Sequence, residues 1–339
     1  MSVFDRKRIL VTGGTGSFGH QFVEMIFAEH SPNEVIVFSR DELKQSEMAK
    51  RFPPSRYPIR YFLGDIRDRE RLMRAFVKVG VVVHAAALKQ VPALEANPFE
   101  AVQTNIIGAQ NVIDAALERE VERVVAVSTD KAVNPLNLYG GTKQVMEKLF
   151  VAANAYVRFR DVAFTVVRYG NVVGSRGSVV PLFRELAGRG ETELPVTDPR
   201  MTRFWISLEQ GVRLVFRAVA DGRGGETFVP KIPSMKVVDM VAAFSPAMGV
   251  RAVGIRPGEK LHETLMNADE ARNAVDRGDH FVILPQFAEH CKAGDAYDGC
   301  PRVAEGFEYR SDNNTEWLGV EALHAMMFGG EPRAEPVLA

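Results

Sequence analysis

The segment Tyr139-Gly140-Gly141-Thr142-Lys143 holds a phenol and an ammonium at a spacing that suits acid-base chemistry. On a helix, residues four positions apart share a face, so these two side chains would lie together. A nearby cation stabilises a phenolate and lowers the pKa of a phenol from its usual value near 10. Tyr139 would then accept a hydroxyl proton while a hydride leaves the same carbon. The pair therefore predicts oxidation or reduction at an alcohol carbon.

Thr129, Asp130 and Lys131 place a hydroxyl, a carboxyl and an amine just upstream of that pair. They follow an apolar run, and we expect them at the carboxyl end of a parallel strand, where such sheets present catalytic groups. Thr129 is suited to hydrogen-bond a substrate oxygen. A proton donor and a proton acceptor beside a hydride-transfer pair exceed the needs of oxidoreduction and indicate elimination. The alternative is that Asp130 caps the next turn and Lys131 is a solvated charge.

Three glycines recur in the segment that runs from Thr12 to Gly19, between an apolar run and an amphipathic one. Glycine lets the backbone turn sharply and approach a pyrophosphate, whose charge meets free N–H groups and the positive end of a helix. The strand-turn-helix context favours dinucleotide binding over a purely structural turn. The predicted contacts in this turn are Gly13, Thr15, Gly16, Ser17, Phe18 and Gly19.

Ser39 and Arg40 end the second apolar run, where an acidic residue would bind the ribose of NAD. A guanidinium and a hydroxyl suit a 2'-phosphate instead, so the sequence favours NADP. In the alternative, Arg40 is a solvated loop charge, Asp41 serves the cofactor, and the cofactor is NAD. Asp65 ends the third run, where it either meets the adenine edge or caps the next helix.

Short β-branched runs alternate with longer amphipathic segments in the first half of the chain, as in β-α-β units. The predicted strands are 8–11, 34–38, 60–63, 81–84, 123–127 and 164–167, and the predicted helices are 20–30, 70–78, 98–118 and 138–159. We expect an α/β fold: a Rossmann-type, doubly wound parallel sheet with a smaller, discontinuous C-terminal substrate lobe. Residues 1–170 would bind NADP, with 201–230 returning to that domain. Residues 171–200 and 231–328 would form the lobe, and 329–339 a frayed tail.

Composition excludes several classes of protein. The 339 residues carry a formal net charge of -1, which gives no long-range field to attract nucleic acid or an anionic membrane. The longest apolar run is too short to span a membrane, and two cysteines are too few for a disulfide framework. We therefore expect a cytoplasmic protein without nucleic-acid or membrane partners. His262-Glu263 lacks the second histidine of a zinc helix, since Met266 stands there, so no metal is expected.

The sequences of these motifs resemble those of the inverting UDP-N-acetylglucosamine 4,6-dehydratases of pseudaminic acid biosynthesis and flagellin glycosylation. These enzymes form a branch of the extended short-chain dehydrogenase/reductase superfamily. The matching segments span most of the chain: 12–19, 38–45, 84–92, 105–115, 128–143, 174–179, 201–205, 228–235 and 255–263. The retaining group carries Glu where Lys131 stands. Capsule-forming relatives carry Met at the position of Tyr139, and membrane-anchored relatives have an N-terminal hydrophobic region not seen here.

The resemblance implies a reaction and further site residues. Tyr139 would take the O4 proton, Lys143 would hold the cofactor ribose and Thr129 would polarise O4. Lys131 would abstract the C5 proton and Asp130 protonate the departing O6, although which of the two is the acid stays open. Further cofactor contacts would be Ile66, Ala85, Ala86 and Lys89. Substrate contacts would be Lys89, Asn171, Arg176, Val179, Arg256 and Glu259. Relatives assemble as hexamers or dimers, so a homo-oligomer is expected.

Two alternatives remain at this point. A nucleotide-sugar epimerase or ketoreductase that uses NAD(P) would need Tyr139 and Lys143 but leave Asp130 and Lys131 without a role. A cofactor-sensing regulatory protein on the same scaffold would need neither pair. The presence of both pairs in one chain favours the dehydratase.

Overall fold

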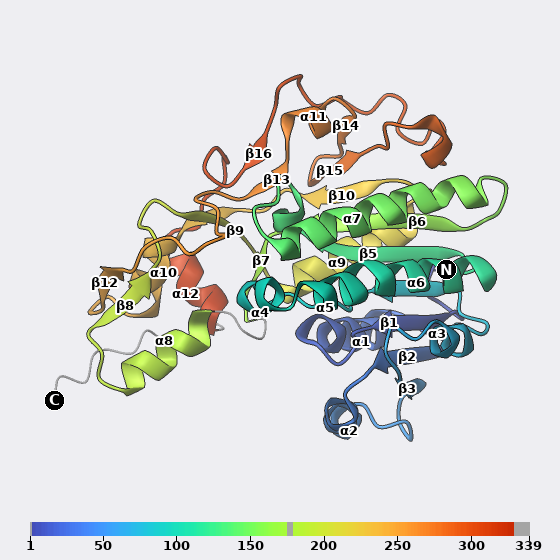
Figure 1. Ribbon diagram of the computed structural model, residues 1–339, viewed down its shortest axis with the longest axis horizontal. Coiled ribbons are helices and arrows are strands. Elements are labelled where there is room, and N and C mark those ends of the chain that lie inside the picture. Colours follow the sequence, from blue (N-terminus) through green and yellow to red (C-terminus); the bar gives the residue numbers. More distant parts are fainter. Residues whose placement is uncertain (1, 175–178, 329–339) are drawn as a thin grey trace.

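Parallel strands form the centre of the molecule, and the computed structural model describes residues 2–174 and 179–328 (Figure 1). The central sheet has nine strands in the order β14-β15-β10-β6-β5-β4-β1-β2-β3. Their bounds are β1 (Arg8–Thr12), β2 (Glu34–Ser39), β3 (Ile59–Leu63), β4 (Val81–His84), β5 (Arg123–Thr129), β6 (Ala163–Tyr169), β10 (Thr227–Pro230), β14 (Ala274–Asp276) and β15 (His280–Ile283). The six predicted strands, and with them the Rossmann-type fold class, are confirmed.

The sheet is wider than the sequence indicated. β10 pairs with β6 in parallel, and β15 and β14 then add two antiparallel strands. These two strands fall within the range 231–328 that we assigned to the lobe, yet they extend the central sheet. Their residues explain this position, because all four residues of β15 are buried, as a strand covered on both faces requires. The predicted tail, 329–339, lies outside the described residues.

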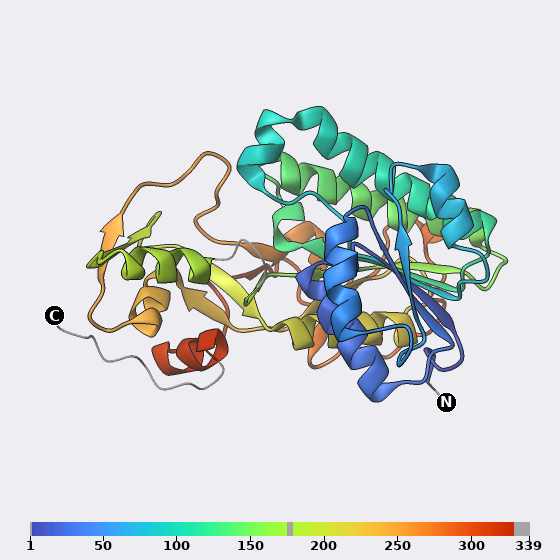
Figure 2. The same cartoon turned by 90° about the horizontal axis from the view of Figure 1, so that it is seen from below.

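Helices cover both faces of the sheet and enclose two separate cores. One core lies under α1, α2 and α9 and includes Phe22, Met48 and Val215; the other lies under α3, α6 and α7 and includes Leu72 and Phe150. Figure 2 shows these two layers on opposite sides of the sheet. The helices of this body are α1 (Ser17–Glu29), α2 (Glu42–Arg51), α3 (Arg69–Ala75), α4 (Val91–Ala96), α5 (Pro98–Val102), α6 (Gly108–Glu118), α7 (Leu138–Ala152) and α9 (Leu208–Asp221).

The described residues also include four short helical turns that are not α-helical. The π-helical turn η1 (Gln103–Ile107) joins α5 to α6, and the 3₁₀ turn η2 (Asp130–Ala132) follows β5. The 3₁₀ turns η3 (Ala153–Val157) and η4 (Ala288–His290) lie after α7 and β15. The predicted helix 98–118 is thus continuous through η1, whereas the predicted helix 138–159 ends in η3. Helix α2 was not predicted, because only two of its ten residues are buried and its apolar pattern is weak.

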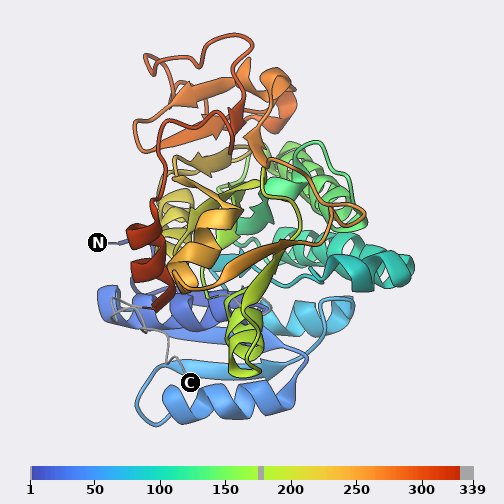
Figure 3. The ribbon, with the colours of Figure 1, turned by 90° about the vertical axis from the view of Figure 1, so that its left-hand side faces the viewer.

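A smaller lobe stands beside the carboxyl ends of the parallel strands, as Figures 1 and 3 show. It has its own core, which includes Phe183, Trp205 and Met240. Its elements are β7 (Asn171–Val172), α8 (Val179–Gly188), β8 (Glu193–Val196), β9 (Thr202–Ile206), β11 (Ser234–Lys236), α10 (Val237–Phe244), β12 (Gly249–Ala252) and α12 (Val320–Phe328). The short elements β13 (Thr264–Met266), α11 (Ala268–Ala271) and β16 (Tyr309–Arg310) lie near β14 and β15.

Gly19 permits the close approach of α1 to the turn before it, and its substitution tests that packing. A Cβ atom at this position would lie 2.1 Å from the backbone oxygen of Gly14, far inside contact distance. We expect Gly19→Ala to lower the free energy of unfolding by about 1–3 kcal/mol, measured by denaturant titration. Gly188→Ala is the matched control, since a Cβ there meets nothing within 4 Å. Equal stability of the two variants would show that this contact is not tight.

Candidate active site

A cleft of about 1120 Å³ runs along the carboxyl edge of the sheet and into the lobe. This is the edge at which open α/β sheets bind ligands. Most of the predicted site residues line it: Gly13, Thr15, Gly16, Ser17, Phe18, Ser39, Arg40, Asp65, Ile66, Ala85, Ala86, Lys89, Thr129, Lys131, Tyr139, Lys143, Asn171, Arg256 and Glu259. Gly19 and Asp130 do not line it, and Arg176 lies outside the described residues. For Val179 only the backbone position, at the start of α8, is described.

The glycine turn forms one end of the cleft. Gly13 adopts a φ of +66°, and a Cβ there would lie 2.8 Å from the Cα atom of Ala86, so only glycine fits. Gly16 precedes α1 and offers no side chain to cap its first N–H groups. The first N–H groups of α1 have no side-chain cap, and the glycines before them leave room for a ligand. Such a helix start suits the negative charge of a pyrophosphate. The turn therefore fits the dinucleotide predicted for it.

The end of the cleft predicted to hold the adenosine ribose carries two cations, Arg40 and Lys44, and two carboxylates, Asp41 and Asp65. Ser39 is held by Gln45, whose Nε2 donates to Ser39 Oγ at 3.0 Å. Asp41 caps α2: its carboxylate accepts from the backbone N–H of Lys44 at 3.0 Å and pairs with the Lys44 ammonium at 2.7 Å. Asp41 is therefore engaged within its own helix. Lys44 was missed by the sequence analysis, although a second cation four residues after Arg40 was a visible signal.

Asp65 lines the cleft and binds its neighbour Arg67. The Arg67 guanidinium pairs with its carboxylate at 2.8 Å, and Arg40 approaches the same oxygen at 3.9 Å. The N-cap of α3 is Asp68, whose side chain accepts from the N–H of Arg71. The alternative in which Asp65 caps the next helix is therefore wrong, because Asp68 fills that position.

Gly140 allows α7 to carry the catalytic pair against η2. A Cβ at Gly140 would lie 2.1 Å from the carbonyl oxygen of Lys131, so glycine is required where α7 crosses this turn. Asn137 caps α7, and its side chain accepts from the N–H of Gly140 at 2.8 Å. The glycine inside the Tyr139–Lys143 motif thus brings Tyr139 and Lys131 into one site.

The pKa of Tyr139 differs from the expectation. Burial raises it to about 12, while the positive charge of Lys131 and a hydrogen bond with Thr129 lower it in part. Lys143 is buried, its ammonium donates to the carbonyl of Val127 at 2.6 Å, and burial lowers its pKa to about 8. The cation that acts on the phenol within the protein is therefore Lys131. Spacing on one helix could not reveal this, since Lys131 comes from another element.

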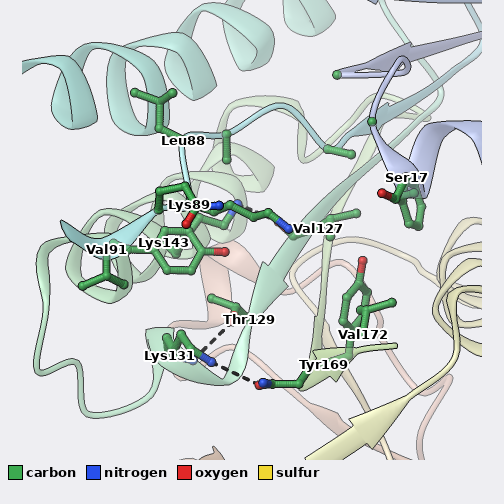
Figure 4. Close-up of a pocket in the computed structure, with 18 of the residues that line it drawn as sticks. Ser17, Leu88, Lys89, Val91, Val127, Thr129, Lys131, Lys143, Tyr169 and Val172 are labelled. Atoms are coloured by element: carbon green, nitrogen blue, oxygen red, sulfur yellow. Dashed lines mark hydrogen bonds between the residues drawn. The ribbon is translucent and has the colours of Figure 1, made fainter. Parts of the chain in front are cut away.

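Three oxygen atoms surround the ammonium of Lys131. Its Nζ atom donates to Asp130 Oδ1 at 2.9 Å and to Asn171 Oδ1 at 3.3 Å, and it lies 3.3 Å from Glu263 Oε1. Thr129 Oγ1 donates to the same Asp130 oxygen at 2.9 Å. Figure 4 shows Thr129 and Lys131 on one side of the cleft, with Lys89 and Lys143 on another. Asp130 does not cap this turn: Thr129 is its N-cap residue, so the capping alternative is wrong.

Asp130 is fully buried behind Thr129 and Lys131. Burial raises its pKa, and the negative charge of Glu263 adds to this effect against the charge of Lys131. For Lys131, burial opposes the charged form, but the two carboxylates outweigh it and raise the pKa above the usual lysine value. The proton of the pair therefore rests on Lys131, which is also the partner that faces the cleft.

Asn105 positions the loop that carries Lys89. It is buried in η1, accepts from the N–H of Leu88 at 2.8 Å, and donates to the Leu88 carbonyl at 2.9 Å and to Thr142 Oγ1 at 3.0 Å. One amide therefore links the cleft wall after β4 to the catalytic helix. The sequence contained a signal for it: a polar residue inside the apolar helical run 98–118.

The lobe closes the other end of the cleft with an apolar wall and a loop that carries charges of both signs. The wall includes Phe183, Trp205 and Met240, and the loop contributes Arg256 and Glu259. Among residues 2–174 and 179–328, no three His, Cys, Asp or Glu side chains gather as a metal site would require. No helix within these residues has the length and apolarity needed to cross a membrane.

Comparison with known proteins identifies the family. A sequence model of the polysaccharide biosynthesis protein family matches residues 9–285. The chain belongs to this family. Over 326 residues it is 49% identical to "UDP-N-acetylglucosamine 4,6-dehydratase (inverting)" from Campylobacter jejuni subsp. jejuni serotype O:2, covering 95% of this chain and 97% of that protein. The resemblance predicted from the motifs is thereby confirmed.

Two further proteins that resemble this chain are informative. "UDP-glucose 4-epimerase" from Rickettsia canadensis is 39% identical and covers 96% of both chains. The crystal structure of DesIV, a dTDP-glucose 4,6-dehydratase from Streptomyces venezuelae with NAD and TYD bound, is 26% identical with a TM-score of 0.64. It covers 75% of this chain and 86% of its own. The shared fold is the Rossmann-type sheet with its lobe.

The amide of Asn105 provides a test of how the cleft wall is held. Asn105→Ala removes three buried hydrogen bonds and leaves the Leu88 backbone groups without their partner. We expect a loss of about 2–3 kcal/mol in the free energy of unfolding, measured by urea titration. Asn97→Ala, which removes one exposed bond to the Ala93 carbonyl, is the control and should change little. Equal losses in both variants would contradict this role for Asn105.

Proposed function

We propose that this protein is a UDP-N-acetylglucosamine 4,6-dehydratase that inverts C5. The product would be UDP-2-acetamido-2,6-dideoxy-β-L-arabino-hex-4-ulose, with loss of one water. The observation that carries this proposal is the Lys131 amine, which faces the cleft and is hydrogen-bonded to a buried carboxyl, Asp130, beside Tyr139. The 49% identical relative with that name supports it.

The chain offers a site for a pyridine nucleotide, which we propose to be NADP. The glycine turn would hold the pyrophosphate, Lys143 the nicotinamide ribose, and Arg40, with Lys44 next to it, a 2'-phosphate. Asp41 caps its own helix, which is why we do not assign it to the ribose of NAD. When bound, the nicotinamide supplies a hydride acceptor for C4 and a hydride donor for C6.

Tyr139 and Thr129 act on the O4 hydroxyl. Thr129 lines the cleft next to Tyr139, and once Asp130 is protonated the Thr129 hydroxyl no longer donates to it and can polarise O4. The ionised phenol of Tyr139 accepts the proton of the O4 hydroxyl. Tyr139 ionises near neutral pH only when its raised pKa is lowered. In the protein, Lys131 and Thr129 are the groups that lower the pKa of Tyr139. The resulting 4-ketone acidifies the proton on C5.

Elimination uses the proton shared by Asp130 and Lys131. Transfer of one proton from Lys131 to Asp130, over the 2.9 Å hydrogen bond, leaves a neutral amine that faces the cleft and a carboxylic acid behind it. The amine takes the C5 proton, the C5–H electrons form the C5=C6 bond, and O6 leaves as water. The proton for O6 comes from Asp130 through the Thr129 hydroxyl, because Asp130 itself does not reach the cleft. C6 would then receive the hydride taken from C4, and a proton from solvent on the face of C5 opposite Lys131 would invert that centre.

The lobe binds the nucleotide. Its apolar wall suits a uracil ring, and the guanidinium of Arg256 suits a pyrophosphate. We assign Lys89, Asn171, Arg176, Val179 and Glu259 to substrate binding as well. Asn171 also holds Lys131, so it would link recognition of the sugar to the position of the base. For the whole protein we propose a cytoplasmic homo-oligomer, hexamer or dimer, that supplies pseudaminic acid biosynthesis for flagellin glycosylation.

Mass spectrometry of UDP-N-acetylglucosamine after incubation with the pure holoenzyme tests the proposal. We expect a product lighter by about 18 Da, the mass of one water lost by acid-base elimination. Tyr139→Phe should lower the rate at least about 100-fold, because the phenol oxygen that accepts the O4 proton is gone. Tyr156→Phe, at an exposed tyrosine on the surface, is the control. A product of unchanged mass from the wild-type protein would contradict dehydration.

An epimerase is the second candidate, because a 39% identical relative carries the name UDP-glucose 4-epimerase. Epimerisation would use Tyr139 and Lys143 but would not need the Lys131 amine or its buried acid. The same mass measurement separates the two activities, since an epimerase returns an isomer of its substrate with no loss of mass.

Arg40 decides between the two forms of the cofactor. Arg40→Ala should weaken NADP binding at least about 10-fold while changing NAD binding little, because only NADP carries a 2'-phosphate for the guanidinium. The measurement is calorimetric titration of the cofactor-free protein with each dinucleotide. Arg51→Ala is the control, since Arg51 pairs with Glu24 instead of lining the cleft. Equal losses for NADP and NAD would refute the assignment.

A further inference from the structure

Glu263 is a buried carboxylate next to the reacting groups, and the mechanism above does not use it. It is 2% exposed and does not line the cleft. Its Oε1 atom lies 3.3 Å from Lys131 Nζ. In the sequence it appears in the segment 255–263 that matches the family and in His262-Glu263, an incomplete zinc pattern. Within the described residues its Oε2 atom has no hydrogen-bond partner, so its position is set mainly by the charges around it.

Two further cations fix the charge of Glu263. Arg203 Nε lies 3.8 Å from Oε1, and Lys260 Nζ lies 3.8 Å from Oε2. Burial opposes ionisation of this carboxyl, but the charges of Lys131, Arg203 and Lys260 outweigh it and lower its pKa. Glu263 therefore stays negative where Asp130, with its raised pKa, can hold a proton. Of the two carboxyl groups beside Lys131, Glu263 favours the ionised form and Asp130 favours the protonated form.

The backbone of Glu263 is held independently of its side chain. The N–H of Glu263 donates to Ser311 Oγ at 2.9 Å, and the N–H of Ser311 donates to the Glu263 carbonyl at 2.9 Å. Its loop also docks on the catalytic helix, because Asn137 Nδ2 donates to the carbonyl of Gly258 at 2.8 Å. Substitution of the Glu263 side chain should therefore leave the loop in place.

An ammonium has three protons to donate, and Lys131 has three acceptors: Asp130, Asn171 and Glu263. They come from three segments, η2, β7 and the loop before β13. Removal of one acceptor frees the amine to rotate away from the other two. A base that must face one carbon of a sugar needs a fixed direction, since small misplacements cost large factors in rate.

We propose that Glu263 is a positioning residue for the elimination: anchored by Arg203 and Lys260, its carboxylate holds the Lys131 amine between Asp130 and Asn171. This inference rests on the proposed dehydratase function. Glu263 does not line the cleft, so it acts through Lys131. Its negative charge raises the pKa of Lys131 and of Asp130 alike.

The first test is kinetic. In the holoenzyme, Glu263→Ala should lower kcat for the dehydrated product about 100-fold, the scale of a misplaced acid-base group, and leave KM within about 3-fold. Incorporation of solvent deuterium at C5 should fall in parallel, whereas reduction of the bound cofactor on C4 oxidation should persist. Glu263→Asp should recover part of the rate. Glu289→Gln, at an exposed carboxylate far from the cleft, is the control.

The second test needs no turnover. Competitive acetylation across a pH series, followed by peptide mass spectrometry, gives the apparent pKa of Lys131 in the folded holoenzyme. Removal of one neighbouring carboxylate in Glu263→Gln should lower that pKa by about one unit. The charged and titratable groups that face Lys131 and Glu263 are Lys89, Asp130, Tyr139, Arg203 and Lys260, and this variant replaces none of them.

The outcomes separate this inference from the proposed function. A wild-type protein that forms no dehydrated product refutes the function, while the Lys131 titration still reports whether Glu263 acts on the amine. A dehydrating wild type whose Glu263 variants match it in kcat and in the Lys131 pKa overturns the inference alone. Equal losses of C4 oxidation and of C5 exchange also overturn it, because they indicate general damage to the site.

Discussion

The Lys131 amine and its three oxygen partners form the contact on which the rest of the site depends. It joins the end of β5, the first strand of the lobe and the loop before β13 at one atom. A charged amine this close to a buried carboxyl is stable only when its donors are satisfied. The sheet brings Asp130 and Lys131 to its carboxyl edge, and the lobe supplies Asn171, so the two parts of the molecule complete one hydrogen-bonded cluster.

Backbone geometry makes that centre possible. Gly140 lets α7 approach η2 so closely that the positive charge of Lys131 lowers the pKa of Tyr139. Gly13 lets the turn after β1 pack on Ala86, so the cofactor end of the cleft begins beside the catalytic end. A Cβ at either position would push apart elements that the chemistry needs in contact. The glycines of the two motifs therefore belong to the function as much as the reactive side chains do.

The features that depend on the order and periodicity of neighbouring residues could be predicted from the sequence. The six parallel strands and the carboxyl-edge position of Thr129 follow from alternation of strand and helix, and the family resemblance followed from the motifs. β14 and β15 were not recognised as sheet strands, because they join it from a distant and irregular part of the chain. Glu263, Arg203 and Lys260 were not recognised as partners of Lys131 for the same reason: their contacts are set by loop docking, which leaves no periodic signal. The raised pKa of Tyr139 depends on burial, which spacing alone does not give.

The central claim is that Lys131 moves the C5 proton while Tyr139 controls oxidation at C4. Solvent-deuterium exchange at C5, followed by mass spectrometry of the UDP-sugar, measures this most directly in a Lys131→Ala holoenzyme. We expect the variant still to reduce its bound cofactor but to incorporate deuterium at C5 at least about 100 times more slowly than the wild type. Exchange at the wild-type rate would contradict it, because another group would then be the base.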